Sequence, residues 1–282
     1  MFQRLSRSWS LVKASASVLR QDKELLLFPV LSLVSLCVVL AVFAVPTIML
    51  GILEGFHGGR GALGPVHYVL AFLFYFSQYF VIFFFNSALV GAAMMRLDGK
   101  DPSLSDGLRI AGSRIGAIAG YALVAATVGL ALRIIQERVG FVGKIVVAIL
   151  GAGWSIATFL VVPVLVSQDI GPIAAVKQSA SLLRKTWGEN LIGQAGIAAA
   201  FGLIFFLVVM AGVVLVIGAV ATHSIALIVL ALVITVLAIG ITALVQAALS
   251  GIYEAALYRF AVDGSQTPGF DSGALQLAFA RR

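Results

Sequence analysis

The sequence is dominated by long runs that contain no charged residue. Five such runs cover residues 25–52, 66–95, 116–132, 145–166 and 191–251. About 20 apolar residues cross the ~30 Å hydrocarbon core of a bilayer, so the last run is long enough for two crossings, divided near Ala221-Thr222-His223. Because lipid offers no hydrogen-bond partner to a bare backbone, each span should be helical. We therefore predict an all-α, polytopic membrane protein with six transmembrane helices.

An amphipathic segment precedes the first predicted span. In residues 1–24, apolar side chains recur three and four positions apart, and the other face carries Arg4, Arg7 and Arg20. This spacing with a basic polar face is typical of a helix lying in the membrane interface. It equally fits a helix that packs on the protein's own cytoplasmic surface, because periodicity does not identify what covers the apolar face. Both interpretations stay open.

The same segment recurs later in the chain. Residues 176–184, VKQSASLLR, match residues 12–20, VKASASVLR, at seven of nine positions, and both copies precede a long apolar span. A weaker third copy at 104–115 has Leu108-Arg109 where the second copy has Val176-Lys177. The copies predict three parallel hairpins related by an axis along the membrane normal. Each hairpin would be preceded by an amphipathic surface helix on the cytoplasmic side.

We expect these units to form a single membrane domain. It would comprise an interfacial helix (1–24), hairpin 1 (25–97), a surface helix with hairpin 2 (102–168), a surface helix with hairpin 3 (172–260) and a cytoplasmic tail (261–282).

Short sequence signals predict details of the surface helix and the two spans of hairpin 2. Ser103 and Asp106 have the spacing of a capping box, which predicts a helix start. Pro163 predicts a kink in the fourth span, since proline cannot donate to the helical backbone. Gly112, Gly116 and Gly120 recur every fourth residue. We interpret them as a groove for close helix contact at the entry of the third span.

Charge is scarce and unevenly distributed. The chain is 61% hydrophobic and 11% charged, which excludes an ordinary soluble domain. If the N-terminus is cytoplasmic, the outer loops hold only Arg60, Arg133, Arg138 and Lys144 of the 19 Lys and Arg residues. This bias predicts that both termini are cytoplasmic. The net charge of +7 then reflects topology and attraction to anionic lipid, and we expect no nucleic-acid partner.

Several motifs carry a resemblance to known proteins. They are Phe85-Asn86-Ser87-Ala88-Leu89, Asp106-Gly107-Leu108-Arg109, Gly151-Ala152-Gly153-Trp154-Ser155, Val161-Val162-Pro163-Val164-Leu165 and the segment 173–189. With these motifs the chain resembles a bacterial family of uncharacterised six-helix integral membrane proteins. Its Pro–loop–Ala–Lys–x-Ser pattern is also similar to the membrane domain attached to some glycerophosphodiester phosphodiesterases. The resemblance implies a multi-pass protein of the bacterial inner membrane and supplies no activity.

Polar residues inside predicted spans are the first candidates for function. Glu254, near the inner end of the sixth span, could act as a gate or coupling site. Alternatively it could form a structural ion pair at headgroup level, with Arg259 nearby and Arg96 adjacent across the bundle. The amides could bind substrate, although hydrogen bonding between helices is their ordinary use in lipid. The candidate intramembrane polar residues are Glu254, Arg96, Asn86, Gln78 and Gln246.

Basic residues of the surface segments are the second set of candidates. The candidate lipid or partner surface consists of Arg4, Arg7, Lys13, Arg20, Arg109, Lys177, Arg184, Lys185 and Trp187. We predict a membrane-embedded interaction or accessory protein that engages a partner or anionic lipid through these helices. The alternative is a transporter or lipid-handling protein for a neutral or amphiphilic substrate, and a membrane enzyme is a remote third. Partners would be membrane lipid and either another protein or further copies of the chain.

The sequence offers little for catalysis or metal binding. His57, His67 and His223 fall on the outer side with Glu54, but their spacing matches no recognised zinc motif. No phosphate-binding Gly-Lys-Ser/Thr loop, Gly-x-Ser-x-Gly elbow or His-Glu-x-x-His motif occurs. We therefore expect no enzymatic activity, no metal and no cofactor.

Overall fold

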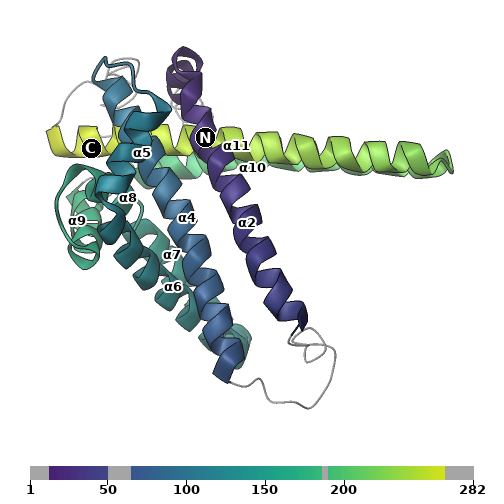
Figure 1. Ribbon diagram of the computed structural model, residues 1–282, viewed down its shortest axis with the longest axis horizontal. Helices are drawn as coiled ribbons and strands as arrows, with labels where there is room; N and C mark the ends of the chain where they lie inside the picture. Colours follow the sequence, from purple (N-terminus) through teal and green to yellow (C-terminus); the bar gives the residue numbers. More distant parts are fainter. Residues whose placement is uncertain (1–12, 50–64, 186–189, 264–282) are drawn as a thin grey trace.

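The computed structural model describes residues 13–49, 65–185 and 190–263, and these residues are helical almost throughout (Figure 1). Residues 13–21 form the first described helix. The later elements are η1 (Lys23–Leu26), α2 (Leu27–Met49), α4 (Pro65–Leu97), α5 (Leu104–Ser113), α6 (Ile115–Arg138), α7 (Phe141–Ala157), α8 (Val161–Ser167), α9 (Pro172–Lys185), α10 (Asn190–Ala221) and α11 (Ile225–Asp263).

The predicted fold class is confirmed. Within the described residues, six helical segments are long and apolar enough to cross a membrane, and no strand occurs. They are Lys23–Val45, Val69–Leu97, Ile115–Arg138, Phe141–Ser167, Phe201–Ala221 and Ile225–Val262. The protein is therefore a multi-pass, all-α membrane protein. The parallel arrangement of three repeated hairpins stays a prediction.

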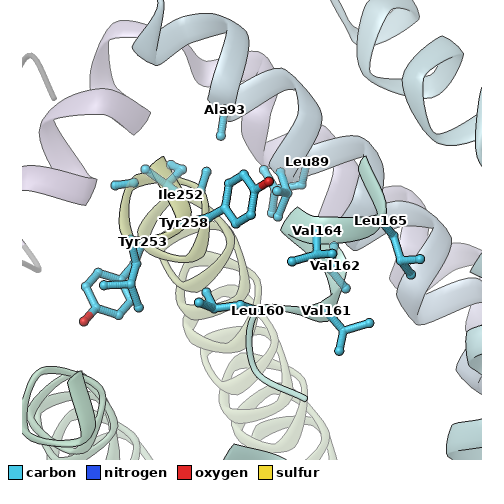
Figure 2. Packing of buried hydrophobic residues seen from close by; sticks show 14 of the residues in the cluster. Leu89, Ala93, Leu160, Val161, Val162, Val164, Leu165, Ile252, Tyr253 and Tyr258 are labelled. Carbon is cyan, nitrogen blue, oxygen red and sulfur yellow. The ribbon is translucent and has the colours of Figure 1, made fainter. Parts of the chain in front are cut away.

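Helix α4 lies at the centre of the molecule. It packs against α2, α5, α6, α8 and α11. The helices α2, α4, α6 and α7 run in a similar direction, whereas α10 and α11 form a long hairpin that lies across them (Figure 1). The C-terminal part of α11 is buried against α4 and α8, where Leu89, Val164 and Ile252 pack together (Figure 2). The rest of the α10–α11 hairpin exposes mainly apolar side chains, as expected for a surface in lipid.

The predicted kink at Pro163 is a complete break. Helix α7 ends at Ala157 and α8 begins at Val161. Proline has no N–H and its ring excludes the carbonyl four residues earlier, so a regular helix cannot continue through it. The break leaves the backbone N–H of Leu160 without a helical acceptor, and it donates instead to the Ser179 hydroxyl of α9 at 3.0 Å. A residue of the surface helix thus completes the hydrogen bonding of a membrane span.

The long last apolar run divides where predicted. Helix α10 ends at Ala221 and α11 begins at Ile225. His223 between them has a φ of 55°, which is the left-handed conformation that a tight turn requires. Helix α11 continues past the apolar run, to Asp263.

The second surface helix begins as predicted, but the glycine groove does not form. The Ser103 hydroxyl accepts from the Asp106 N–H and the Asp106 carboxylate accepts from the Ser103 N–H, which completes the capping box. Arg114, with φ −112° and ψ 13°, then separates α5 from α6. This bend places Gly112 and Gly116 on different helices, and a β-carbon added at either position would have no neighbouring atom within 4 Å. Gly120 alone of the three approaches another element, at Pro172.

Candidate functional site

The two best-matched surface helices use their small and apolar faces to pack on the bundle. In helix 13–21, Ser15 and Val18 are buried while Lys13 and Arg20 are exposed. In α9, the buried residues are Ala175, Ser179, Leu182 and Leu183, and the exposed residues include Lys177 and Arg184. The apolar faces are therefore covered by protein, and the basic faces point outward.

Two pairs of matched positions in the copies are buried alike. Ser15 and Ser179 are both fully buried, and Val18 and Leu182 are buried beside them. In the weaker copy, Ala111 stands at the position of these serines and is also buried. Two positions before this buried serine or alanine, each copy has an exposed basic residue. These residues are Lys13, Arg109 and Lys177.

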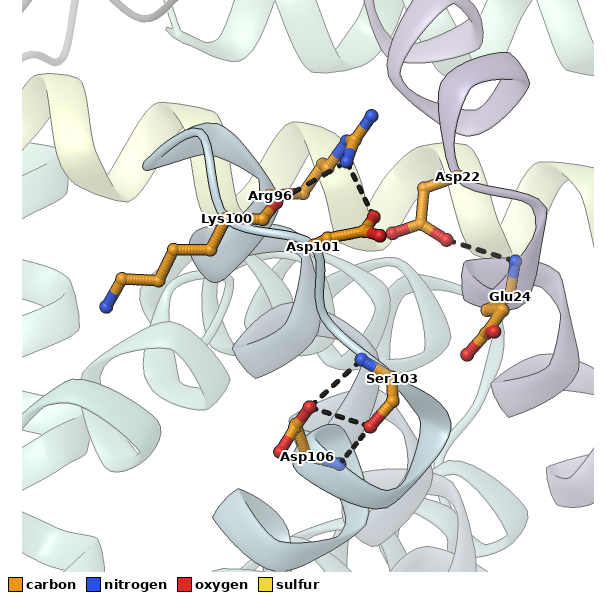
Figure 3. Close-up of polar contacts among 7 residues, drawn as sticks. All are labelled: Asp22, Glu24, Arg96, Lys100, Asp101, Ser103 and Asp106. Carbon is orange, nitrogen blue, oxygen red and sulfur yellow. Dashed lines mark hydrogen bonds and ion pairs between the residues drawn. The ribbon is translucent and has the colours of Figure 1, made fainter.

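Three arginines near the surface helices are paired with acids. Arg96 pairs with Asp101 at 2.9 Å (Figure 3). Arg259 pairs with Asp98 at 2.7 Å, and Arg114 pairs with Asp169. Within the described residues, no ion pair involves Lys13, Arg20, Lys177 or Arg184, and Arg109 is mostly exposed with Asp106 3.5 Å away. Helix 13–21 and α9 thus carry four unpaired cations, and Lys23 and Lys100 are exposed without an ion pair among the described residues as well.

Acidic side chains organise the start of α5. The Glu24 carboxylate accepts the Leu104 N–H at 2.9 Å, which ties η1 to the N-terminus of α5. Hydrogen bonds from the Ser103 hydroxyl and backbone hold the pKa of Asp106 below its ordinary value. Burial raises the pKa of Asp22, whose carboxyl accepts the Glu24 N–H at 3.1 Å (Figure 3). The lowered pKa of Asp106 keeps its carboxylate ionised in the first turn of α5, where the helix dipole favours negative charge.

Glu254 lies deeper in the bundle than its place in the sequence suggested. The Asn86 amide donates to the Glu254 carboxylate at 3.4 Å. Asn86 precedes the last residue of α4, Leu97, by 11 positions, which is ~16 Å along the helix axis. Gly251 permits this contact, since an added β-carbon there would lie 2.5 Å from the Leu89 side chain. The carboxylate thus faces the middle of α4 rather than its charged end.

The expected cationic partners of Glu254 are engaged elsewhere. Arg96 pairs with Asp101 and Arg259 pairs with Asp98, so neither forms an ion pair with Glu254. The Glu254 carboxylate instead meets Asn86, which precedes Arg96 by about 15 Å along the axis of α4. The structural ion pair considered from the sequence is not formed among the described residues.

Aromatic side chains lie on the same face of α4 as Asn86, since Tyr79, Phe83 and Asn86 are spaced four and three residues apart. Tyr121 of α6 interacts electrostatically with Glu254 and reaches Thr158 at the end of α7. The Phe83 ring packs on Tyr121 with centroids 4.5 Å apart, and Tyr79 stacks on Phe83 at 5.8 Å. Residues from α4, α6 and α11 therefore form a polar and aromatic cluster inside the membrane part, which we call the Glu254 cluster.

Most of the chain matches a known protein family. Residues 65–270 match a family described as "Family of unknown function (DUF6159)". The chain belongs to this family. No match to the chain was found among curated proteins. The DUF6159 match contains both α9 and the Glu254 cluster, whereas helix 13–21 precedes it. The likeness to the membrane domain of phosphodiesterases stays unconfirmed.

Two further contacts of this DUF6159 member were not predicted. The Gln168 amide donates to the Tyr258 hydroxyl at 3.0 Å, and Arg114 pairs with Asp169. Both join segments far apart in sequence, and no local pattern identifies them. The predicted candidates Gln78 and Gln246 are half-buried, and no side-chain hydrogen bond connects them to another described residue.

Some predicted residues of the DUF6159 member lie outside the described part of the chain. They are Arg4, Arg7, Glu54, His57 and Trp187, together with the side chains of His67 and Lys185. His223 is exposed at the turn between α10 and α11. Among the described residues, no group of three His, Cys, Asp or Glu side chains could hold a metal ion.

Proposed function

We propose that this membrane protein is an interaction protein that engages anionic lipid headgroups through the basic faces of helix 13–21 and α9. One observation carries the proposal: four cations of these helices are exposed and unpaired among the described residues, namely Lys13, Arg20, Lys177 and Arg184, while Arg96, Arg114 and Arg259 are neutralised by acids. An exposed cation near an anionic membrane surface contributes about 1 kcal/mol of attraction. Several such residues on one surface are enough to enrich anionic lipid around the protein.

The packing of these helices favours electrostatic contact over insertion. A helix that inserts into the interface needs a free apolar face. Here Val18, Leu182 and Leu183 are buried inside the protein. Apart from Ile173 and Ala174 at the start of α9, the exposed residues are Lys, Arg, Ser and Gln, a surface suited to phosphate-bearing headgroups or to an acidic protein. We place it on the cytoplasmic side of the bacterial inner membrane, and the proposal assigns the protein no catalytic step and no cofactor.

Reversal of charge on α9 is expected to reduce the enrichment of anionic lipid. The full chain, purified in a non-ionic detergent, would be incubated with equal amounts of phosphatidylglycerol and phosphatidylcholine and then repurified. Mass spectrometry would give the ratio of the two bound lipids. We expect K177E/R184E to lower the phosphatidylglycerol ratio at least about fivefold, because each lost cation removes about 1 kcal/mol. The loss should shrink at high salt, which screens exposed charges.

A matched control reverses cations at the opposite ends of the spans. Arg138 and Lys144 are exposed where α6 ends and α7 begins. The variant R138E/K144E should retain the lipid ratio of the unaltered protein. If K177E/R184E folds normally and retains it too, the proposed lipid surface is wrong. A stoichiometric protein that co-purifies and is lost in K177E/R184E, with an unchanged lipid ratio, would identify a protein partner instead.

The proposed orientation gives a separate expectation. In a Cys37→Ser background, Ser181→Cys on α9 should react with a membrane-impermeant maleimide only after cells are permeabilised. Arg60→Cys, in the predicted outer loop, should react in intact cells, because the distribution of Lys and Arg places that loop outside. Labelling of both positions in intact cells would overturn the topology.

A further inference from the structure

The Glu254 cluster contains a carboxylate that lacks a cationic partner. Its only hydrogen bond within the described residues comes from the neutral Asn86 amide, at 3.4 Å. By contrast, Asp98, Asp101, Glu137 and Asp169 each pair with an arginine. Glu254 therefore differs from these acids, and it is also the one that lies against the middle of a membrane span.

This arrangement is energetically unfavourable for the protein alone. A charged side chain in the hydrocarbon region costs at least about 2.5 kcal/mol, and acids found there usually pair or mark a pathway for a substrate or ion. One long hydrogen bond from a neutral amide contributes about 1 kcal/mol, which does not offset that cost. Protonation removes this cost, and a bound cation would offset it while the carboxylate stays ionised.

The surroundings of the carboxylate indicate what kind of cation fits. A metal ion needs several oxygen, nitrogen or sulfur ligands, and no group of three such acidic, His or Cys side chains exists among the described residues. Phe83 lies one helical turn before Asn86 on α4, and its ring packs on Tyr121, which interacts electrostatically with Glu254. Aromatic faces attract organic cations, especially where water is excluded. The chemistry therefore favours an organic cation over a hydrated metal ion.

We propose that Glu254, Asn86 and the Tyr121 ring form a binding site, within the membrane part of the protein, for the cationic group of a lipophilic organic cation. Glu254 supplies the opposite charge, and Asn86 holds one carboxylate oxygen in place through its amide. Neither Glu254 nor Asn86 is fully shielded by the protein, since each residue keeps part of its surface exposed. An amphiphilic amine fits because its apolar body stays in the hydrocarbon while its charge meets the carboxylate. The site is independent of the basic faces of helix 13–21 and α9.

The probe for this site is radiolabelled tetraphenylphosphonium, a lipophilic organic cation. Equilibrium dialysis with the full chain in non-ionic detergent should show saturable binding. Glu254→Gln keeps the size and hydrogen bonding of the side chain but removes its charge, and it should weaken binding at least tenfold. The matched control is Glu137→Gln, an exposed carboxylate paired with Arg133 on α6, which should bind as the unaltered protein does. Equal binding by E254Q and the unaltered chain, or no saturable binding by either, would overturn the site.

A second measurement does not depend on how the variant folds. Dicyclohexylcarbodiimide is a hydrophobic reagent that modifies carboxyl groups in apolar surroundings, and mass spectrometry locates the modified residue. In the unaltered chain, we expect it to modify Glu254 and tetraphenylphosphonium to protect that residue. Modification of Glu254 that the cation does not reduce would contradict the proposal. Neither result depends on whether phosphatidylglycerol binds to α9, so the two proposals fail separately.

Discussion

Replacing Gly107 by alanine is expected to destabilise the protein by about 1–3 kcal/mol or more, the range found for overpacked cores. A β-carbon at this position would lie 2.4 Å from the Phe28 ring and 2.8 Å from the Ala88 carbonyl oxygen. Phe28 is fully buried, and Ala88 belongs to the backbone of the central helix α4. Neither neighbour can move aside freely, so α5 must shift away from α2 and α4.

The same helix provides the control for this prediction. Gly112 of α5 is exposed, and no atom lies within 4 Å of an added β-carbon. Gly112→Ala should be neutral or slightly stabilising, since alanine favours helix over glycine by about 1 kcal/mol. Thermal unfolding in detergent, followed by fluorescence-detected size exclusion, would compare the two variants. A Gly107→Ala protein as stable as the Gly112→Ala protein would show that α5 does not pack on α4 as described.

The elements themselves could be predicted because their signals are local. Runs without charge predict helices in lipid, where no other open structure satisfies the backbone. The Ser103–Asp106 capping box, the break before Pro163 and the turn at His223 each depend on a few neighbouring residues. The glycines at 112 and 116 were misinterpreted because a bend at Arg114 follows from tertiary packing and leaves no mark in the spacing of glycines.

The surroundings of Glu254 could not be predicted in the same way. Counting from the end of the apolar run places Glu254 at headgroup level only if α11 stands parallel to α4. The structure instead has α11 lying across α4, and the close approach at Gly251 brings Glu254 to Asn86. Crossing directions depend on the packing of whole helix surfaces. The contact between residues 168 positions apart therefore has no local signal.

The repeated surface segment could be predicted only in part. Identity at seven of nine positions predicted equivalent helices, and the matched residues Val18 and Leu182 are indeed buried alike. Periodicity did not reveal that a serine stands at the centre of each buried face. It also did not reveal that the two serines differ in hydrogen bonding. Ser179 accepts a backbone N–H, whereas the Ser15 hydroxyl is buried without a partner among the described residues.

This difference leads to opposite expectations for the same substitution. Ser179→Ala should cost about 1–3 kcal/mol of stability, because it leaves the buried N–H of Leu160 without an acceptor. Ser15→Ala should be neutral or stabilising, because it removes a buried hydroxyl that has no hydrogen-bond partner among the described residues. Both changes delete one oxygen atom from matched positions, so helix propensity and lost volume affect them equally.

Thermal unfolding of the two single variants and the unaltered chain would measure the difference directly. The midpoint should fall for Ser179→Ala and stay level or rise for Ser15→Ala. Equal losses would mean that the serines serve both helices in the same way and that Ser15 has an acceptor or donor in the folded protein. No loss for Ser179→Ala would mean that the Leu160 N–H finds another acceptor at the α7–α8 break. The expected result would show that α9 stabilises an interrupted membrane span through a single hydroxyl, a role that the matching position of helix 13–21 does not have.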